Sequence, residues 1–395
     1  MATVQTVYEV LQNIRSVDIA VHQQRCVVVR NRKAGCRRCA DACTSGAISH
    51  EENQLVISAE KCVGCGTCAT ACPTCALEAL NPNDAALLQA VRAAAKANGG
   101  VAVVACRLIV EAATGLLAPD RLVAVECLGR VEESLPVSLA ADGIDKLLLV
   151  RGACEECEHK TGIATAQTVV DTANELFAMW RSSANVAIVE KFPASVRAEA
   201  PAAFDEGRRN FFFRTKDEAI RVTAAAADAA LKTPEEAQAE AARETPYVKV
   251  MDDGTLPHCL PDRRERLLDG LAALGEPAGG LLTGRLWGHV VIDPELCTSC
   301  RMCATFCPTG ALRKFDEDGA MGLDHYPADC VCCRCCEDIC PEHALQVFNE
   351  VLAEDLLAGV AERTPMKPPK YDMKSPTRAR TMFRDILGFD GIYDR

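Results

Sequence analysis

Two cysteine runs near the C-terminal end of the chain contain the residues best suited to chemistry. Each run has the spacing C-x2-C-x2-C-x3-C, and a proline follows its last cysteine. Thiolates are soft ligands that suit iron–sulfur clusters, and this spacing is one in which cysteines hold [4Fe–4S] clusters. We therefore expect two such clusters here. The first run is Cys297, Cys300, Cys303 and Cys307, and the second is Cys330, Cys333, Cys336 and Cys340.

The two runs are expected to exchange their fourth cysteines, as paired runs of this kind do. Cys340 then completes the Cys297 group, and Cys307 completes the Cys330 group. Cys332 and Cys335 lie inside the second run, where they are either alternative ligands or small buried hydrophobic residues. The members are Cys297, Cys300, Cys303 and Cys340 in the Cys297 group, and Cys330, Cys333, Cys336 and Cys307 in the Cys330 group.

An N-terminal pair of runs repeats this pattern with one change. Nine residues, VVVRNRKAG, separate Cys26 from the next cysteine, where two would be usual. We predict that this segment forms a strand and a turn at Ala34-Gly35, which folds Cys26 back. If Cys26 does not bind, a three-iron cluster or substitution by Cys75 would result. The members are Cys26, Cys36, Cys39 and Cys72 in the Cys26 group, and Cys62, Cys65, Cys68 and Cys43 in the Cys62 group.

Four more cysteines follow predicted buried strands in the middle of the chain. The apolar segments 101–105, 122–126, 146–150 and 185–190 alternate with predicted helices over 108–117, 131–141 and 163–181, which indicates a parallel sheet. Ligand sites in such sheets lie beyond the carboxyl ends of the strands. The Cys106 group, Cys106, Cys127, Cys154 and Cys157, is therefore expected to meet at one edge. It could hold a [2Fe–2S] or [4Fe–4S] cluster or zinc, or Cys106 and Cys127 could be buried hydrophobic residues.

These elements predict a mixed α+β and α/β fold, in which two βαββαβ dicluster modules flank a central α/β domain. We expect a module at 1–82, the central domain at 83–192, a helical Ala/Glu-rich linker at 193–285, a second module at 286–348, and a helix with a tail at 349–395. Predicted details are an Asp84-capped helix over 83–100, a strand at 54–58, and helices over 215–244, 263–274 and 347–362. The tail from Pro365 either wraps a partner or stays disordered.

Composition excludes several classes of protein. The formal net charge is −12 and aromatic residues make up 5% of the chain, which argues against nucleic-acid binding. The cysteines are bunched, unlike a secreted disulfide framework. The chain shows neither a basic start followed by an apolar core nor an apolar run of about 20 residues, so we expect a cytoplasmic protein without a transmembrane segment. It could still attach to a membrane complex through partners.

Several stretches resemble known families. Residues 20–80 and 287–348 resemble dicluster ferredoxin domains. Residues 100–181 resemble the hydrogenase iron–sulfur subunit family, the delta subunit of methyl-viologen-reducing hydrogenases that couple to heterodisulfide reductase, through Cys-x-Gly-Arg at 127–130 and Cys-x2-Cys-x-His-Lys-Thr-Gly at 154–162. The resemblance implies a central [2Fe–2S] cluster that relays electrons between a catalytic subunit and a flavin-containing partner. Ile109 departs from the family, which often has a cysteine there.

We therefore expect a non-catalytic electron-transfer subunit of a hetero-oligomeric oxidoreductase complex in anaerobic metabolism. It would carry four [4Fe–4S] clusters and a central [2Fe–2S] or [4Fe–4S] cluster. Its partners would be a catalytic subunit (a hydrogenase, a molybdenum or tungsten pterin enzyme, or a heterodisulfide-reductase-like protein) and a flavoprotein or ferredoxin. No dinucleotide or phosphate-binding glycine motif appears. The alternatives are a thiol/disulfide reductase acting at Cys154 and Cys157, and a zinc-held scaffold. Arg37, Arg301 and Arg334 lie between predicted ligands and are candidates for raising cluster potentials.

Overall fold

A computed structural model describes residues 18–51, 53–198, 251, 254–317 and 319–368. The chain divides into two units, residues 1–197 with 249–395, and residues 198–248. All elements below belong to the first unit. The helix predicted over 215–244 and the tail after Pro368 are outside the described residues, as is the start of the chain.

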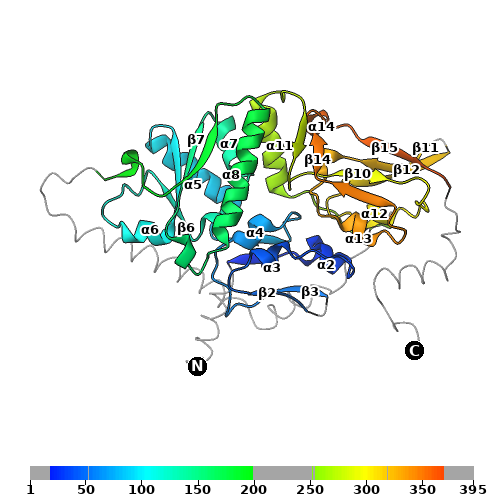
Figure 1. Cartoon of the computed structure of the whole chain (residues 1–395), viewed down its shortest axis with the longest axis horizontal. Helices are drawn as coiled ribbons and strands as arrows, with labels where there is room; N and C mark the ends of the chain where they lie inside the picture. Colours follow the sequence, from blue (N-terminus) through cyan, green and yellow to red (C-terminus); the bar gives the residue numbers. More distant parts are fainter. Residues whose placement is uncertain (1–17, 52, 199–250, 252–253, 318, 369–395) are drawn as a thin grey trace, which may run out of the picture. The chain divides into compact units, whose positions relative to one another are not determined.

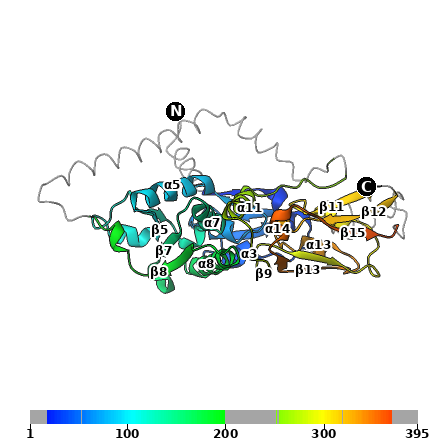
Figure 2. The same cartoon turned by 90° about the horizontal axis from the view of Figure 1, so that it is seen from above.

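The segment between the two cysteine-rich modules in the sequence forms a four-stranded parallel sheet (Figures 1 and 2). The strand order is β6-β5-β7-β8, and all neighbouring pairs are parallel. The parallel sheet predicted from the four apolar segments is thus confirmed. Its strands are β5 (Val101–Cys106), β6 (Val123–Val125), β7 (Lys146–Val150) and β8 (Asn185–Val189).

Helices alternate with these strands along the chain, as predicted. Asn83, and not the expected Asp84, caps the first helix, because the Asn83 side chain accepts a hydrogen bond of 2.8 Å from the Ala86 amide. The helices are α5 (Asp84–Ala97), α6 (Arg107–Ala112), α7 (Ser134–Ala141) and α8 (Gly162–Met179), with short 3-10 turns η2 (Leu128–Arg130), η3 (Cys154–Glu156) and η4 (Ala194–Val196).

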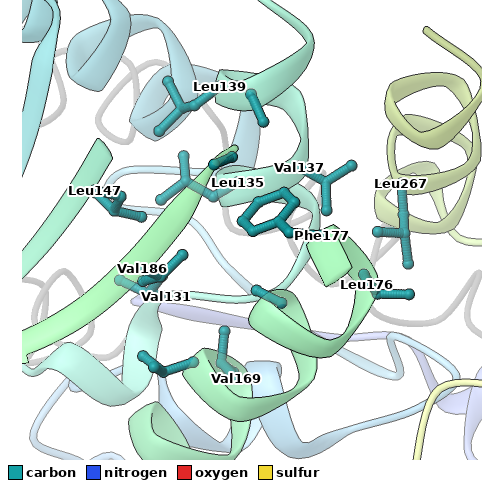
Figure 3. Close-up of a cluster of buried hydrophobic side chains, with 14 of the residues drawn as sticks. Val131, Leu135, Val137, Leu139, Leu147, Val169, Leu176, Phe177, Val186 and Leu267 are labelled. Atoms are coloured by element: carbon teal, nitrogen blue, oxygen red, sulfur yellow. The ribbon is translucent and has the colours of Figure 1, made fainter. Parts of the chain in front are cut away.

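The largest hydrophobic core joins this sheet to helix α11 (Asp262–Leu274), which confirms the helix predicted over 263–274. Figure 3 shows Val137 of α7, Leu176 and Phe177 of α8, and Leu267 of α11 in this core. Gly270 lets α11 approach α7 closely, because a Cβ atom there would lie 2.8 Å from Val137 Cγ1. Full burial of such side chains stabilises a fold by about 1.5–3 kcal/mol each. This packing holds α11 in the position from which it reaches the cysteine groups.

The N-terminal module has a pair of antiparallel strands, a hairpin and three short helices. Strand β1 pairs with β4 and β2 pairs with β3. The predicted strand at 54–58 is confirmed as β3. The elements are β1 (Ile19–Val21), η1 (Gln23–Arg25), α2 (Val27–Arg30), α3 (Arg38–Ala42), β2 (Ile48–Glu51), β3 (Gln54–Ile57), α4 (Thr67–Ala71) and β4 (Leu77–Ala79).

The strand predicted after Cys26 is wrong, because Val27–Arg30 is the helical turn α2. The Arg30 amide donates to the Cys26 carbonyl at 3.0 Å, and the Asn31 amide donates to the Val27 carbonyl at 2.9 Å. Three consecutive valines favour a strand locally, but tertiary contacts override that preference. Val27 and Val29 are buried, and the Arg30 side chain bonds to residues distant in the sequence.

The C-terminal module has the element order strand, helix, two strands, helix, strand. Strand β10 pairs with β13, and β11 pairs with β12, both antiparallel. The elements are β10 (His289–Ile292), α12 (Met302–Phe306), β11 (Leu312–Glu317), β12 (Ala320–His325), η5 (Pro327–Asp329), α13 (Cys335–Ile339) and β13 (Leu345–Phe348).

The helix predicted over 347–362 is also wrong. This stretch contains β14 (Glu350–Leu352), paired with β9 (Leu281–Thr283), the short helix α14 (Asp355–Ala358) and the start of β15 (Glu362–Met366). Gly359, at φ 62°, ends α14 in the left-handed region that glycine favours. Strand β15 then pairs with β12, where Arg363 holds Asp324 through two hydrogen bonds of 2.8 and 2.9 Å. Pairing with an existing sheet edge, which sequence periodicity does not reveal, decides this structure.

None of the described helices is long and apolar enough to cross a membrane.

Candidate metal centres

All 24 cysteines lie within the described residues, and all are free thiols. The Cys26 group gathers around the start of α2 and α3 and the end of α4. Burial, with smaller contributions from Cys72 and Cys36, raises the pKa of Cys26 to about 11. Burial raises the pKa of Cys39 to about 12, and Cys72, Cys26 and Cys36 add to that rise. The negative charge of one thiolate thus raises the pKa of others in the group, which indicates that these sulfur atoms lie near one another.

The Cys62 group gathers in the same way around the start of α4 and the end of α3. Burial raises the pKa of Cys68, and Cys65, Cys62 and Cys43 raise it further. Burial alone would raise the pKa of Cys43, but hydrogen bonds from the Ser45 hydroxyl and nearby amides lower it overall. This loop therefore stabilises a sulfur anion, which is the form that binds metal.

Hydrogen-bond donors recur behind the fourth cysteine of the runs. At Cys43, Cys72 and Cys340 an amide four residues later donates to the sulfur, and at Cys43, Cys72 and Cys307 a hydroxyl lies two residues after the cysteine. At Cys340 the equivalent residue is Glu342, which has no hydroxyl. The amide contacts are Ala47 to Cys43 at 3.4 Å, Ala76 to Cys72 at 3.3 Å and Ala344 to Cys340 at 3.3 Å. The hydroxyl contacts are Ser45 to Cys43 at 3.5 Å, Thr74 to Cys72 at 3.7 Å and Thr309 to Cys307 at 3.8 Å.

Cys75 occupies a turn position three residues after Cys72. Its φ is 48°, and the residues equivalent to it after the other fourth cysteines also have positive φ: Gly46 at 62°, Gly310 at 74° and His343 at 50°. Burial raises the pKa of Cys75 to about 12. Cys72, Cys26 and Cys36 raise the pKa of Cys39, and the choice of Cys26 over Cys75 as the fourth member of this group stays a prediction.

The extra cysteines of the last run also occupy structural positions. Cys332, at φ 49°, is equivalent to Gly64 at 66° and Ser299 at 59° in the other runs. Cys335 begins α13 and donates to the Phe306 carbonyl at 3.8 Å. Both are buried at 2% and 1% exposure, as expected of small hydrophobic residues.

The Cys106 group lies at the carboxyl edge of the parallel sheet. Cys106 ends β5, Cys127 follows β6, and Cys154 begins the turn η3 after β7. Burial, with smaller contributions from Cys65 and Cys106, raises the pKa of Cys127 to about 11. Burial also raises the pKa of Cys154, as do Cys106 and Cys157. The structure thus brings these four thiols to one edge.

Close packing fixes Cys127 against the N-terminal module. A Cβ atom on Gly162, the first residue of α8, would lie 2.1 Å from Cys127 Sγ and 3.3 Å from Thr67 Oγ1. A Cβ on Gly129 would lie 2.5 Å from that same Thr67 hydroxyl. These two positions require glycine because the Cys127 sulfur and the Thr67 hydroxyl leave no room for a Cβ atom. Ile109 lies beside this site, since a Cβ on Gly152 would lie 2.7 Å from its Cγ2.

The two C-terminal groups each form a neighbourhood as well. Burial raises the pKa of Cys303, and Cys300, Cys340 and Cys297 raise it further. In the other group, burial raises the pKa of Cys336 well above its ordinary value, with Cys333, Cys330 and Cys307 contributing. The cysteines that influence each group thus include the fourth cysteine of the opposite run, while their exchange as cluster ligands stays a prediction.

The influence of cysteines on one another's pKa values indicates one order for the five groups. Cys303 raises the pKa of Cys336, which links the Cys297 group to the Cys330 group. Cys26 raises the pKa of Cys335, which lies inside the Cys330 run, and this links the Cys26 group to that run. Cys39 raises the pKa of Cys68, which links the Cys26 group to the Cys62 group. Cys65 raises the pKa of Cys127, which links the Cys62 group to the Cys106 group. The order is Cys297, Cys330, Cys26, Cys62 and Cys106 group.

This donor set fits iron–sulfur clusters. Four thiols per group match the ligand number of [4Fe–4S] and [2Fe–2S] clusters. Thiolates crowded into buried sites repel one another, and cationic iron removes that repulsion. Backbone amides that already point at Cys43, Cys72, Cys297 and Cys340 sulfurs supply the outer hydrogen bonds of such a site.

Three arginines expected near the clusters are each paired with an acid. Arg37 lies 3.4 Å from Asp41 and is largely exposed. Arg301 lies 2.6 Å from Asp316. Arg334 lies 3.0 Å from Glu337. Pairing and solvent reduce the field that each can exert on a cluster.

Three further arginines are buried or half-buried. Arg30, one of several basic residues that crowd the first cysteines in the sequence, is 2% exposed, and Arg264 is 5% exposed. Arg263 donates to the Ala69 carbonyl at 2.7 Å and to the Cys72 carbonyl. Arg264 donates to the Leu286 carbonyl and lies over the Trp287 ring at 4.8 Å. The sequence analysis missed Arg263 and Arg264, for which an Arg-Arg pair at the start of an otherwise amphipathic helix was the available signal.

The fold and the cysteine groups define a class, the iron–sulfur proteins. Comparison with known families agrees: residues 33–76 match the 4Fe-4S dicluster domain, and residues 290–313 match the 4Fe-4S binding domain. These two matches support an iron–sulfur electron-transfer protein with [4Fe–4S] clusters. Neither match includes the central sheet. No curated protein and no solved structure matches the chain.

Proposed function

We propose that the chain is an electron-transfer subunit of a multisubunit oxidoreductase complex, in which five cysteine groups hold clusters in single file. The four groups of the two terminal modules would hold [4Fe–4S] clusters, and the Cys106 group a [2Fe–2S] or [4Fe–4S] cluster. When bound, these clusters supply one-electron redox chemistry. The observations that support the proposal are the two family matches and the contacts that join the cysteine-bearing parts: Arg30 donates to the Cys307 carbonyl at 3.2 Å, and a Cβ atom on Gly162 would lie 2.1 Å from Cys127 Sγ.

The residues of the chain would bury, separate and tune the redox centres. Loops of the N-terminal and C-terminal modules supply amide and hydroxyl donors to the sulfur atoms. Such hydrogen bonds, together with burial and charge, set the potential of a cluster. Electron tunnelling weakens steeply with distance, so an ordered row of groups favours transfer along the row.

The two ends of the row are the proposed contacts with partners. Cys154 and Cys157 at one end, and Cys297 and Cys300 at the other, are only partly buried. Exposed leucines adjoin both ends: Leu108 is 46% exposed and Leu296 is 51% exposed. We propose that one end meets a catalytic subunit and the other a flavoprotein or ferredoxin. Exposed apolar residues next to a redox centre are suitable for such docking.

Metal and sulfide analysis of anoxically purified protein tests this proposal. Four four-iron clusters and a two-iron cluster would give about 18 iron atoms per chain, and five four-iron clusters about 20, with equivalent acid-labile sulfide. A colourless protein that contains zinc and no sulfide would instead favour a zinc-held scaffold and overturn the proposal.

A further inference from the structure

The unusual insertion in the nine residues between Cys26 and Cys36, together with Arg38 just beyond it, contacts the C-terminal cysteine runs. Arg38 donates to the Cys332 carbonyl at 2.8 Å. The Gly35 amide donates to Asp338 of α13 at 3.2 Å. Arg30 donates to the Cys307 carbonyl at 3.2 Å. The insertion thus binds the Cys26 group of one module to the Cys330 group of the other.

Arg30 is the buried centre of this junction. Besides Cys307, its guanidinium donates to the carbonyls of Phe306 at 3.0 Å, Pro257 at 2.6 Å and Gln24 at 2.8 Å. Four carbonyl groups orient and partly solvate the cation. They carry no net charge, however, so they do not neutralise it.

No carboxylate forms an ion pair with Arg30 within the part of the chain that the structure describes. The ionisable side chains that influence Arg30 are those of Cys335, Cys307 and Cys333, whose sulfur atoms carry negative charge only when they are deprotonated or bound to a metal. An isolated buried cation is strongly unfavourable, and it persists where an opposite charge compensates it. Cysteine-ligated clusters are anionic and would supply that charge. Arg263 differs, because Glu132 and Asp84 also act on it.

We propose that the insertion is an electron-transfer junction between the two modules, in which the buried Arg30 cation raises the reduction potentials of the adjoining Cys330 and Cys26 clusters. This inference depends on the proposed function, since it requires clusters in both groups. Arg30 acts as a positioning and tuning residue, because it contacts carbonyls of the loops and no reacting atom.

The electron balance of this step is simple. One electron leaves the reduced cluster on one side of the junction and enters the oxidised cluster on the other. No bond forms or breaks and no proton moves, because an arginine stays protonated in proteins. Reduction adds one negative charge to a cluster, and the fixed cation favours that reduced form on either side.

The test is a potentiometric titration of the full chain followed by electron paramagnetic resonance, with Arg30→Met and Arg30→Lys variants. Arg30→Met removes the charge and should lower the midpoint potential of the Cys330 cluster. We expect at least a tenfold change in its reduction equilibrium, which is about 59 mV for one electron. The Cys26 cluster should shift in the same direction. Arg30→Lys keeps the charge and should restore most of the potential.

Matched variants keep the test decisive if Arg30→Met binds iron poorly. Asp338→Asn removes a negative charge at the same junction and should shift the Cys330 cluster upward. Arg92→Met removes an exposed arginine of α5, paired with Asp142 and away from the cysteine runs, and should leave all potentials unchanged. Unshifted potentials in Arg30→Met, or in Asp338→Asn when Arg30→Met fails to load, would overturn the inference. Absence of clusters from the wild-type protein would overturn the proposed function itself.

Discussion

At the scale of single residues, the sulfur atoms are distinguished by the donors around them. Three fourth cysteines have a hydroxyl two residues later, from Ser45, Thr74 and Thr309, whereas Cys340 has Glu342. Hydrogen bonds to cluster sulfurs stabilise the more negative, reduced state. Cys340 therefore lacks a donor that the other fourth cysteines have, whereas Thr298 supplies a hydroxyl to Cys300 in the same group.

Replacing Thr74 or Thr309 by valine should lower the potential of the corresponding cluster. The change keeps the shape of the side chain and removes one donor to Cys72 or Cys307. A net hydrogen bond is about 1 kcal/mol, so the shift should be some tens of millivolts. Redox titration measures it, and Thr168→Val on the exposed face of α8 is the control. An unchanged midpoint in both variants would show that these hydroxyls do not tune the clusters.

At the scale of elements, the cysteine spacing and hydrophobic pattern predicted most of the framework. Strand β7 was predicted to the residue, and β5, β8 and α11 nearly so, because buried strands and amphipathic helices have clear periodicities. The segments α2 and β15 were missed. Arg30 of α2 and Glu362 of β15 are placed by partners far along the chain, and such contacts leave no local pattern. The spacing also grouped thiols that the structure brings together, while their binding of iron stays a prediction.

The first turn of α8 provides a selective test of the Cys106 group. Gly162→Ala would place a Cβ atom 2.1 Å from Cys127 Sγ, so the sulfur must move. We expect loss of the central cluster alone, which removes about two to four iron atoms per chain. Iron analysis and electron paramagnetic resonance measure this loss. Gly284→Ala, where a Cβ meets nothing within 4 Å, is the control. Full iron content in Gly162→Ala would contradict the placement of Cys127 at a metal site.

Strand β15 provides a test by pH. Glu362 Oε2 lies 3.3 Å from His325 Nδ1 and 3.1 Å from His289 Nδ1. Hydrogen bonding to His325, together with the charge of both histidines, lowers the pKa of Glu362 despite its partial burial. The resulting stabilisation is complete above the ordinary carboxyl pKa and is lost as pH falls through the lowered value.

Thermal unfolding from neutral pH down to about pH 3 should therefore show less acid destabilisation in Glu362→Gln than in wild type. Glu350→Gln, at an exposed position of β14, is the control and should match wild type. Identical acid profiles for wild type and Glu362→Gln would show that this contact does not stabilise the fold.

At the scale of the whole first unit, the three cysteine-bearing parts share their contacts. Helix α11 packs against α7, and its arginines reach carbonyls of the N-terminal module at Ala69 and of the C-terminal segment at Leu286. Arg285 forms a second connection, with Glu133 at 2.6 Å and the Thr70 carbonyl at 3.2 Å. These contacts join the parts that carry the cysteine groups, and in the proposed order the Cys26 group stands between the Cys330 and Cys62 groups.

The most direct test of a continuous row is the magnetic coupling between reduced clusters in wild type and in a Cys36→Ser, Cys39→Ser double variant. Both proteins would be fully reduced and compared by electron paramagnetic resonance. Removing the middle cluster should abolish its interaction with the Cys330 and Cys62 clusters, while the Cys297–Cys330 and Cys62–Cys106 interactions remain. Spectra of the other four clusters that are identical with and without the middle cluster would contradict the single-file arrangement.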